Sequence, residues 1–236
     1  MSITVLAVLA AGAVTLALSP LFAVTELLLT GVEGSDAELV RAVAGLDTGD
    51  NLLRLDLAAA ERRVEQLSWV RDASVTREPP STVRITVTPR RAEVVVLLAE
   101  SAWLVDSDGY VIGGGTEPGL VPIEARNSVL PGVGSPTRDA AILNALAVHR
   151  ALPSRLRDML VGYHAPSDRG LRLRLAPPGL DPLWVRFGVA DRAADKAGVL
   201  LALLDDVVSS SSATGGPSIA TIDVRAPGNP VLIPAG

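Results

Sequence analysis

The sequence contains no cysteine, which excludes disulfide bonds and thiolate chemistry. Aromatic residues make up only 3% of the 236 residues, so the hydrophobic cores must be built from Val, Leu, Ile and Ala. Lysine is nearly absent as well, because Lys196 is the only lysine among 21 basic residues. The net charge of −5 argues against a general nucleic-acid binder, which needs a basic face to displace counterions from phosphates.

Motifs of catalysis and metal binding are also missing. The sequence has no Gly-x-Ser-x-Gly elbow, no phosphate-binding loop and no HExxH motif. The two histidines, His149 and His164, fall on different predicted elements, without Glu or Cys at ligand spacing, and are expected at the surface or a sheet edge. We therefore predict a protein without catalytic activity, cofactor, metal or small-molecule substrate.

The first 24 residues read as a membrane anchor. Ile3 to Val24 carry no charge, and a helix of these 22 residues would be about 33 Å long, enough to cross a hydrocarbon core of about 30 Å. A cleavable signal is the alternative, but it normally has a basic start, and cleavage after Ala17-Leu18-Ser19 would place Pro20 next to the cut. Acidic residues follow the span, which favours an extracytoplasmic C-terminal part.

Residues 25–91 predict a small α+β domain. Leu27–Leu29 indicate a buried strand, and a helix with a Ser35–Glu38 capping box is expected to end before Gly45. A second helix is expected to begin after Asp56 as its N-cap. Two alternating runs around Pro79-Pro80, within residues 67–88, predict a closing hairpin. The expected order is strand, helix, helix, strand, strand.

Residues 92–236 predict a mixed β domain with two longer helices, so the fold class of the chain is α+β. The helices are expected from Ser135–Pro136 to Leu152 and over residues 191–208. A polar loop is expected over residues 209–216, followed by a last strand over residues 219–224. The tail after Pro227 is interrupted by prolines and is not expected to form a strand.

Several runs resemble one family. Phe22-Ala23-Val24, Gly31, the segment from Gly49 to Asp56 and the segment from Leu67 to Pro80 resemble the POTRA domain of the FtsQ/DivIB bacterial cell-division proteins. The Asp108-Gly109 turn, the helical Lys196 and the segment Ile222-Asp223-Val224-Arg225 resemble the FtsQ β domain. The alternative for the first domain is a generic small α+β unit.

The resemblance implies a non-enzymatic, single-pass scaffold in the cytoplasmic membrane at the division septum, with the N-terminus inside. Its implied partners are FtsB-like and FtsL-like proteins, one of which adds a strand to the edge made by the last strand. A family arginine that lies just ahead of the strand preceding the last helix, and that pairs with an acidic partner residue, falls near Arg169. The implied partner-binding residues are Arg169, Ile219, Thr221, Ile222, Asp223, Val224, Arg225 and Ala226.

This chain departs from the family where some members have an aromatic residue, because it has Ala226 followed by Pro227 there. Three alternatives remain. The last strand could be an interior or covered strand that no partner uses. The chain could be a POTRA protein of secretion or outer-membrane assembly, which predicts a following barrel of at least about eight strands. It could also be an extracytoplasmic wall enzyme.

Overall fold

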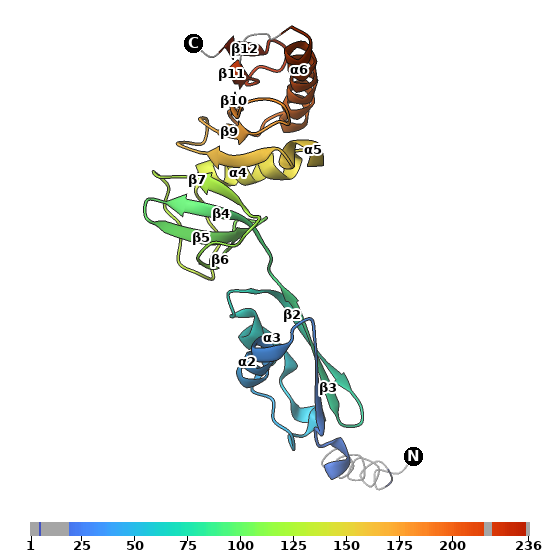
Figure 1. The fold of residues 1–236 in the computed structure, drawn as a ribbon. Helices are drawn as coiled ribbons and strands as arrows, with labels where there is room; N and C mark the ends of the chain where they lie inside the picture. Colours follow the sequence, from blue (N-terminus) through green and yellow to red (C-terminus); the bar gives the residue numbers. More distant parts are fainter. Residues whose placement is uncertain (1–4, 6–18, 215–218, 235–236) are drawn as a thin grey trace. The chain divides into compact units, whose positions relative to one another are not determined.

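The computed structural model describes residues 5, 19–214 and 219–234. The chain divides into two compact units, with the division between Arg90 and Arg91 (Figure 1). Unit 1 and unit 2 each have their own hydrophobic core.

Unit 1 has the order strand, helix, helix, strand, strand that the sequence predicted. Its three-stranded sheet has the order β1-β3-β2, with β1 parallel and β2 antiparallel to β3. Two short 3-10 turns precede β1 and α3. The elements are η1 (Pro20–Phe22), β1 (Glu26–Thr30), α2 (Gly34–Ala44), η2 (Leu52–Arg54), α3 (Leu57–Glu65), β2 (Val70–Glu78) and β3 (Thr82–Pro89).

The hairpin of β2 and β3 forms as its alternation predicted. Val83, Ile85 and Val87 of β3 are buried on the face that packs against the helices, while Thr86 and Thr88 are exposed on the other face. Burial of each aliphatic side chain contributes about 1.5–3 kcal/mol. The strand β3 is therefore the centre of the unit 1 core.

The helix ends of unit 1 were predicted in part. Asp56 caps α3, because its Oδ1 accepts the Ala59 N–H over 2.9 Å. The predicted capping box of α2 is wrong: α2 begins at Gly34, and its N-cap Glu33 makes no side-chain capping bond. The other end of α2 is closed by Gly45 in the left-handed conformation and by Arg63, whose Nε donates to the Ala44 carbonyl over 3.1 Å.

The end of the predicted anchor belongs to unit 1. Pro20–Phe22 form η1, and Val24 is buried in the core with its N–H bonded to the Asp50 carbonyl over 2.8 Å. Of the rest of the predicted span, residues 3, 4 and 6–18 lie outside the described residues. In the part of the chain that the structure describes, no helix has the length and apolar character needed to cross a membrane.

Unit 2 is built on one mixed, nine-stranded sheet of order β12-β11-β10-β9-β8-β7-β4-β5-β6. Its first strands are β4 (Ala92–Leu98), β5 (Ser101–Asp106), β6 (Val111–Gly114) and β7 (Val121–Glu124). The helices α4 (Ala140–Ala151) and α5 (Ser154–Arg157) follow. The remaining elements are β8 (Leu160–His164), β9 (Arg172–Leu175), β10 (Leu183–Arg186), α6 (Ala193–Thr214), β11 (Ile219–Asp223) and β12 (Val231–Pro234).

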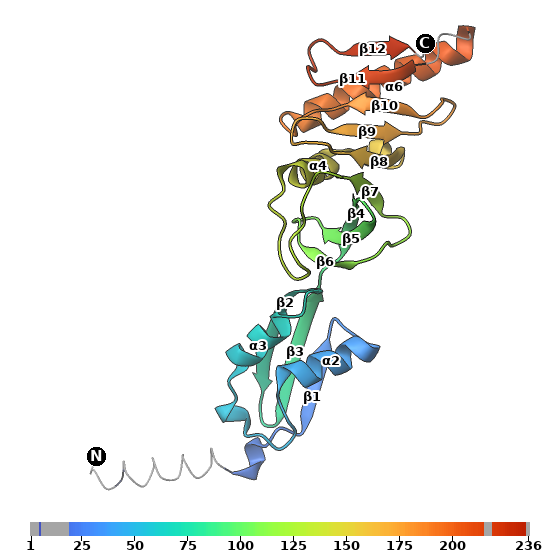
Figure 2. The same cartoon turned by 90° about the vertical axis from the view of Figure 1, so that its left-hand side faces the viewer.

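One face of this sheet carries the unit 2 core. Leu173, Val185 and Ile222, from three neighbouring strands, are fully buried in the same core as Leu146 of α4 and Leu200 of α6. Figures 1 and 2 show α6 running along the strands β9 to β12 on one side. Arg172, Arg174 and Arg186 alternate with these buried residues along β9 and β10, so they lie on the opposite face.

Several boundaries in unit 2 differ from the predictions. The helix expected from Ser135 begins at Ala140, with Asp139 as N-cap, because Ser135 and Pro136 pair with the segment around β6 instead. The expected loop over residues 209–216 is helical up to Thr214, the last residue of α6. The tail after Pro227 was not expected to form a strand, but it forms β12.

Candidate functional site

The predicted binding edge is not an edge. The strand β11 pairs in parallel with β10 on one side and antiparallel with β12 on the other, so the prediction of an open edge at Ile219–Ala226 is wrong. Sequence reasoning missed β12 because prolines on both sides of a three-residue apolar run argue against an interior strand, but they are tolerated in an edge strand. Within the described residues, no strand pairs with the outer side of β12.

The direction of each main-chain group on β12 follows from the ladder. Val224 donates its N–H to the Arg186 carbonyl of β10. Main-chain groups alternate in direction along a strand, so those of Ile222 also point to β10, and those of Thr221 and Asp223 point to β12. Leu232 lies opposite Ile222. Two residues that lie opposite each other in an antiparallel ladder either both bond to each other or both point their main-chain groups away from each other, and Ile222 points away from β12. The N–H and C=O of Leu232 therefore point to the open side, as do the carbonyls of Pro230 and Pro234.

The other end of the sheet is covered at the first residue of β6. Val111 of β6 accepts a hydrogen bond from the Gly134 N–H over 2.9 Å and donates one to the Ser135 carbonyl over 3.0 Å. An isolated bridge joins Tyr110 to Pro136 next to this pair. The segment that the sequence predicted as a helix start thus covers the β6 edge at Val111, whereas in the described part of the chain no strand covers the outer side of β12.

The predicted site residues of β11 divide into two groups. The side chains of Ile222 and Val224 are fully buried in the core, so they cannot contact a partner directly. Thr221 and Asp223 alternate with them and lie on the helix-free face of the sheet. The remaining residues are partly buried Ile219 in β11, exposed Arg225 directly after it, and Ala226, whose carbonyl accepts the Asn229 N–H over 2.9 Å.

An arginine-lined hollow lies on the helix-free face beside β11. Its volume is about 230 Å³, and four of its lining residues are arginines that come from the segment before β9, the start of β9, the end of β10 and the segment after β11. Arg169 and Arg225, both predicted from sequence, line this hollow together. Arg169 lies ahead of β9 and not, as predicted, ahead of the strand preceding the last helix, which is β10. The lining residues are Pro166, Arg169, Gly170, Leu171, Arg172, Arg186 and Arg225.

Sequence reasoning missed Arg172 and Arg186 as site residues. The alternation of Arg172 with buried leucines is visible in the sequence, but the direct pairing of Arg172 with Arg186 requires the register of β9 and β10. Arg186 in turn lies beside Asp223, and Asp223 lies opposite Val231 of β12. A row of neighbouring residues across the sheet therefore leads from Arg172 in the hollow to Val231 of β12.

The charge of the hollow is only partly compensated. Arg225 Nη2 donates to Asp223 Oδ2 over 2.6 Å, and this bond, supported by the charge of Arg186, holds the pKa of the Asp223 carboxyl below its ordinary value. Asp168 Oδ2 lies 3.9 Å from Arg169 Nε. Four guanidinium groups against these two carboxylates leave a positive excess, in a chain whose net charge is −5. The hollow is suited to anionic groups.

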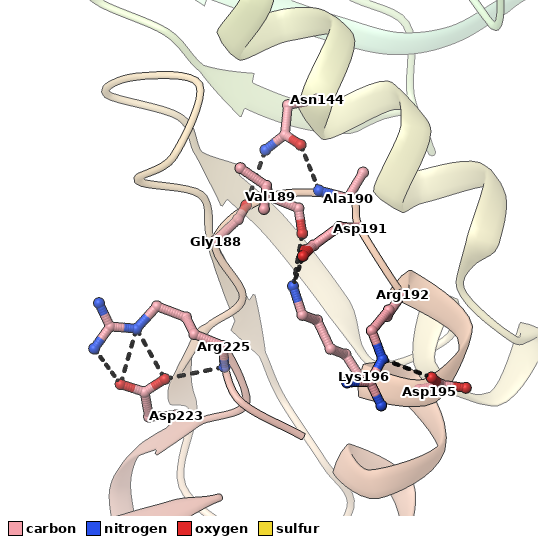
Figure 3. Close-up of polar contacts among 10 residues, drawn as sticks. All are labelled: Asn144, Gly188, Val189, Ala190, Asp191, Arg192, Asp195, Lys196, Asp223 and Arg225. Carbon is pink, nitrogen blue, oxygen red and sulfur yellow. Dashed lines mark hydrogen bonds and ion pairs between the residues drawn. The ribbon is translucent and has the colours of Figure 1, made fainter. Parts of the chain in front are cut away.

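A buried lysine fixes the loop that supports Arg225 (Figure 3). Lys196 is 2% exposed, and its Nζ donates to the Val189 carbonyl over 2.9 Å and to Asp191 Oδ1 over 2.5 Å. Asn144 of α4 holds the same loop by accepting the Ala190 N–H and donating to the Gly188 carbonyl. A side-chain Cβ built at Gly188 would lie 3.2 Å from Arg225 Cγ, so the loop forms the surface against which Arg225 rests.

The histidines differ from their prediction in one case. His149, expected at the surface, is buried, and its Nδ1 lies 2.9 Å from the Tyr163 hydroxyl while its Nε2 lies 3.5 Å from Glu93 Oε1. Burial lowers the pKa of His149. His164 is half-buried, with its Nδ1 3.5 Å from Glu124 Oε2. Among the described residues, no group of His, Cys, Asp and Glu could hold a metal ion.

Comparison with known proteins agrees with this architecture. Residues 22–90 match the family model described as the POTRA domain of the FtsQ type, which coincides with the described part of unit 1 from Phe22 onward. The chain is 28% identical over 183 residues to the cell division protein FtsQ of Corynebacterium glutamicum. The matched residues cover 75% of this chain and 77% of that protein. The chain belongs to the FtsQ family.

Other relatives extend the similarity into unit 2. The cell division protein FtsQ of Mycobacterium tuberculosis is 30% identical over 201 residues, which cover 85% of this chain and 61% of that protein. The FtsQ of Streptomyces bingchenggensis is 28% identical over 216 residues, which cover 89% of this chain and 75% of that protein. The chain thus spans about three fifths of the mycobacterial relative.

Proposed function

We propose that this chain is a membrane-anchored, non-enzymatic scaffold of the bacterial cell-division machinery, located at the septum with both units extracytoplasmic. Membership of the FtsQ family and the uncharged N-terminal segment support this role. The matched family model is of the FtsQ type, which favours division over secretion or outer-membrane assembly. The domains are an anchor that ends before Pro20, a POTRA domain up to about residue 91, and a β domain from there to the C-terminus.

The scaffold recruits FtsB-like and FtsL-like partners by strand addition to its sheet. The observation that supports this mode best is the difference between the two ends of the nine-stranded sheet: Gly134 and Ser135 cover β6 at Val111, while β12 presents the N–H and C=O of Leu232 outward. We therefore assign partner binding to β12 and not, as the sequence predicted, to β11. The residues of β11 act indirectly, by holding β12 in register.

The arginine-lined hollow supplies specificity beside this edge. A strand that pairs with β12 continues past Val231, which lies opposite Asp223 and next to the row that contains Arg186. The partner segment that follows the paired strand crosses the helix-free face, where its acidic side chains pair with Arg169, Arg172 and Arg186, and Arg225 is held in place by Asp223. Main-chain hydrogen bonds provide affinity, and the arginines select an acidic partner.

The test removes one hydrogen-bond donor. The substitution Leu232→Pro deletes the outward N–H of β12 without removing any bond between β12 and β11, whereas Leu232→Ala keeps that N–H. We expect the full chain with Leu232→Pro to lose co-purification with its FtsB-like partner, while Leu232→Ala retains it. An unchanged circular dichroism spectrum and unfolding midpoint confirm that both variants fold. Full partner recovery with Leu232→Pro would overturn strand addition at β12.

A further inference from the structure

Unit 1 exposes two leucines at the end where the chain enters it from the N-terminal segment. Leu21 is 59% exposed in η1, and Leu53 is 44% exposed in η2. They are 32 positions apart in the sequence. The antiparallel bridge between Ala23 and Asn51 places the segment before Ala23 and the segment after Asn51 at the same end of the bridge. Both leucines therefore lie at that end, near the junction with the apolar N-terminal run.

Local hydrogen bonds hold both leucines in their exposed positions. The Leu53 N–H donates to Asn51 Oδ1 over 3.0 Å, and Leu52, its neighbour, is fully buried in the core, which turns Leu53 outward. The Leu21 N–H likewise donates to Ser19 Oγ over 3.2 Å. The outward direction of the two side chains is thus determined by two capped 3-10 turns.

We propose that Leu21 and Leu53 form a membrane-contact surface, through which unit 1 rests on the apolar boundary of the bilayer next to the anchor. The inference rests on the proposed anchor and adds a second contact that is far from it in sequence. The occupant is lipid because Leu21 directly follows, in the sequence, the uncharged run from Ile3 to Pro20 that supplies the proposed anchor.

The charges around this surface define which lipid chemistry it uses. Arg54 is exposed in the same turn as Leu53, and a long arginine side chain can place its apolar part in the interface and its guanidinium at the headgroups. Asp47, Asp50 and Asp56 flank the turn, so anionic headgroups are not attracted overall. The contact is therefore apolar and requires no anionic lipid.

The absence of cysteine makes a direct test possible, because a single introduced cysteine carries the only label. The full chain with Leu53→Cys, labelled with an environment-sensitive fluorophore, is reconstituted into vesicles that contain a lipid with a brominated acyl chain. Leu39→Cys, at a site in α2 that is 42% exposed, is the matched control. We expect quenching at position 53 to exceed that at position 39 by at least about twofold, in zwitterionic and anionic vesicles alike.

A second labelled variant, Leu21→Cys, distinguishes failure of the Leu53 contact from failure of the proposed anchor. Quenching at position 21 without quenching at position 53 overturns the contact of Leu53 and leaves the anchor intact. Failure of the labelled chain to float with vesicles after a high-salt wash overturns the anchor and the inference together. Quenching at position 53 only in anionic vesicles overturns the apolar contact.

Discussion

Arg225 donates to both carboxylate oxygens of Asp223, with Nη2 2.6 Å from Oδ2 and Nε 3.0 Å from Oδ1. The two residues are separated by the buried Val224, so their side chains leave the sheet together beside the arginine-lined hollow. The pair lowers the local repulsion among the arginines and fixes the position of one of them. Its contribution to stability and its contribution to binding can be measured separately.

The substitution Arg225→Met is expected to reduce the free energy of unfolding at pH 7 by less than about 1 kcal/mol, because Arg225 is largely exposed. The folded state lowers the pKa of Asp223 below its ordinary value of 3.8, so this contribution is present above pH 3.8 and is lost as the pH falls through the lowered pKa. Urea unfolding of both proteins at pH 7 and at about pH 2.5 measures the difference. An equal difference at both pH values would assign the effect to packing.

Charge reversal in the hollow is expected to weaken partner binding. Arg186→Glu places a carboxylate beside Asp223, where it repels the acidic side chains of the proposed partner. We expect the affinity for the partner to fall by about 5- to 30-fold and to depend less on salt concentration. The control Arg126→Glu makes the same charge change in the loop after β7. Isothermal titration at two salt concentrations measures both effects. An equal loss in the two variants would contradict a specific role for the hollow.

The substitution Lys196→Met is expected to destabilise unit 2 by about 1–3 kcal/mol, because the Val189 carbonyl loses its buried donor and Asp191 loses its partner. The control Arg192→Met removes an exposed pair with Asp195 and is expected to cost at most about 0.5 kcal/mol. Thermal unfolding followed by tryptophan fluorescence compares them, with Trp69→Phe in both proteins so that the signal comes from Trp103 and Trp184 of unit 2. Equal midpoints would show that the Lys196 contacts contribute little.

Gly31→Ala is expected to destabilise unit 1 by more than about 2 kcal/mol, because Gly31 has a φ of +92° and a Cβ there would lie 1.9 Å from the Val87 carbonyl oxygen. Gly49→Ala is the matched control, since Gly49 has a φ of +102° but open space around its Cβ position, and it is expected to cost about 1 kcal/mol. Hydrogen exchange of the unit 1 amides measures both. A larger loss for Gly49→Ala would contradict the close approach of β1 and β3 as the cause.

The pH dependence of stability is expected to contain a contribution from His149. Burial lowers its pKa in the folded state despite the nearby Glu93, so below the ordinary value of 6.5 the unfolded state binds more protons. Stability therefore falls as the pH decreases from 6.5 towards the lowered pKa. His149→Gln is expected to flatten this slope in urea unfolding, whereas His164→Gln, which leaves His149 in place, is expected to keep it. An unchanged slope in His149→Gln would assign the dependence to other groups.

The sequence predicted unit 1 better than unit 2. The alternation around Val83 and Ile85 and the Asp56 cap depend on local physics, and the structure confirms both. The capping box failed because Ser35 lies inside α2, after a glycine that already begins the helix. Local patterns thus predict elements more reliably than they predict where those elements begin.

In unit 2 the errors concern pairing over long distances. Ser135 and Pro136 have the local character of a helix start, but hydrogen bonds with Val111 hold this segment against β6. The burial of His149 depends on Tyr163, which is 14 residues away in β8. Arg169 and Arg225 were predicted by resemblance alone, and their meeting in one hollow could not be derived from spacing because they are 56 positions apart.

Two prolines limit which strands can pair with the open edge of β12: Pro230, directly before the strand, and Pro234, its last residue. Within residues 230–234, all of which the structure describes, Leu232 carries the single outward N–H, because Pro230 and Pro234 have none. Two copies that met edge to edge would therefore have one donor each for several carbonyls, and continuous growth of the sheet between copies is disfavoured. A partner strand that supplies its own donors is not subject to this limit. The two prolines thus favour a partner strand over a second copy of the chain at this edge.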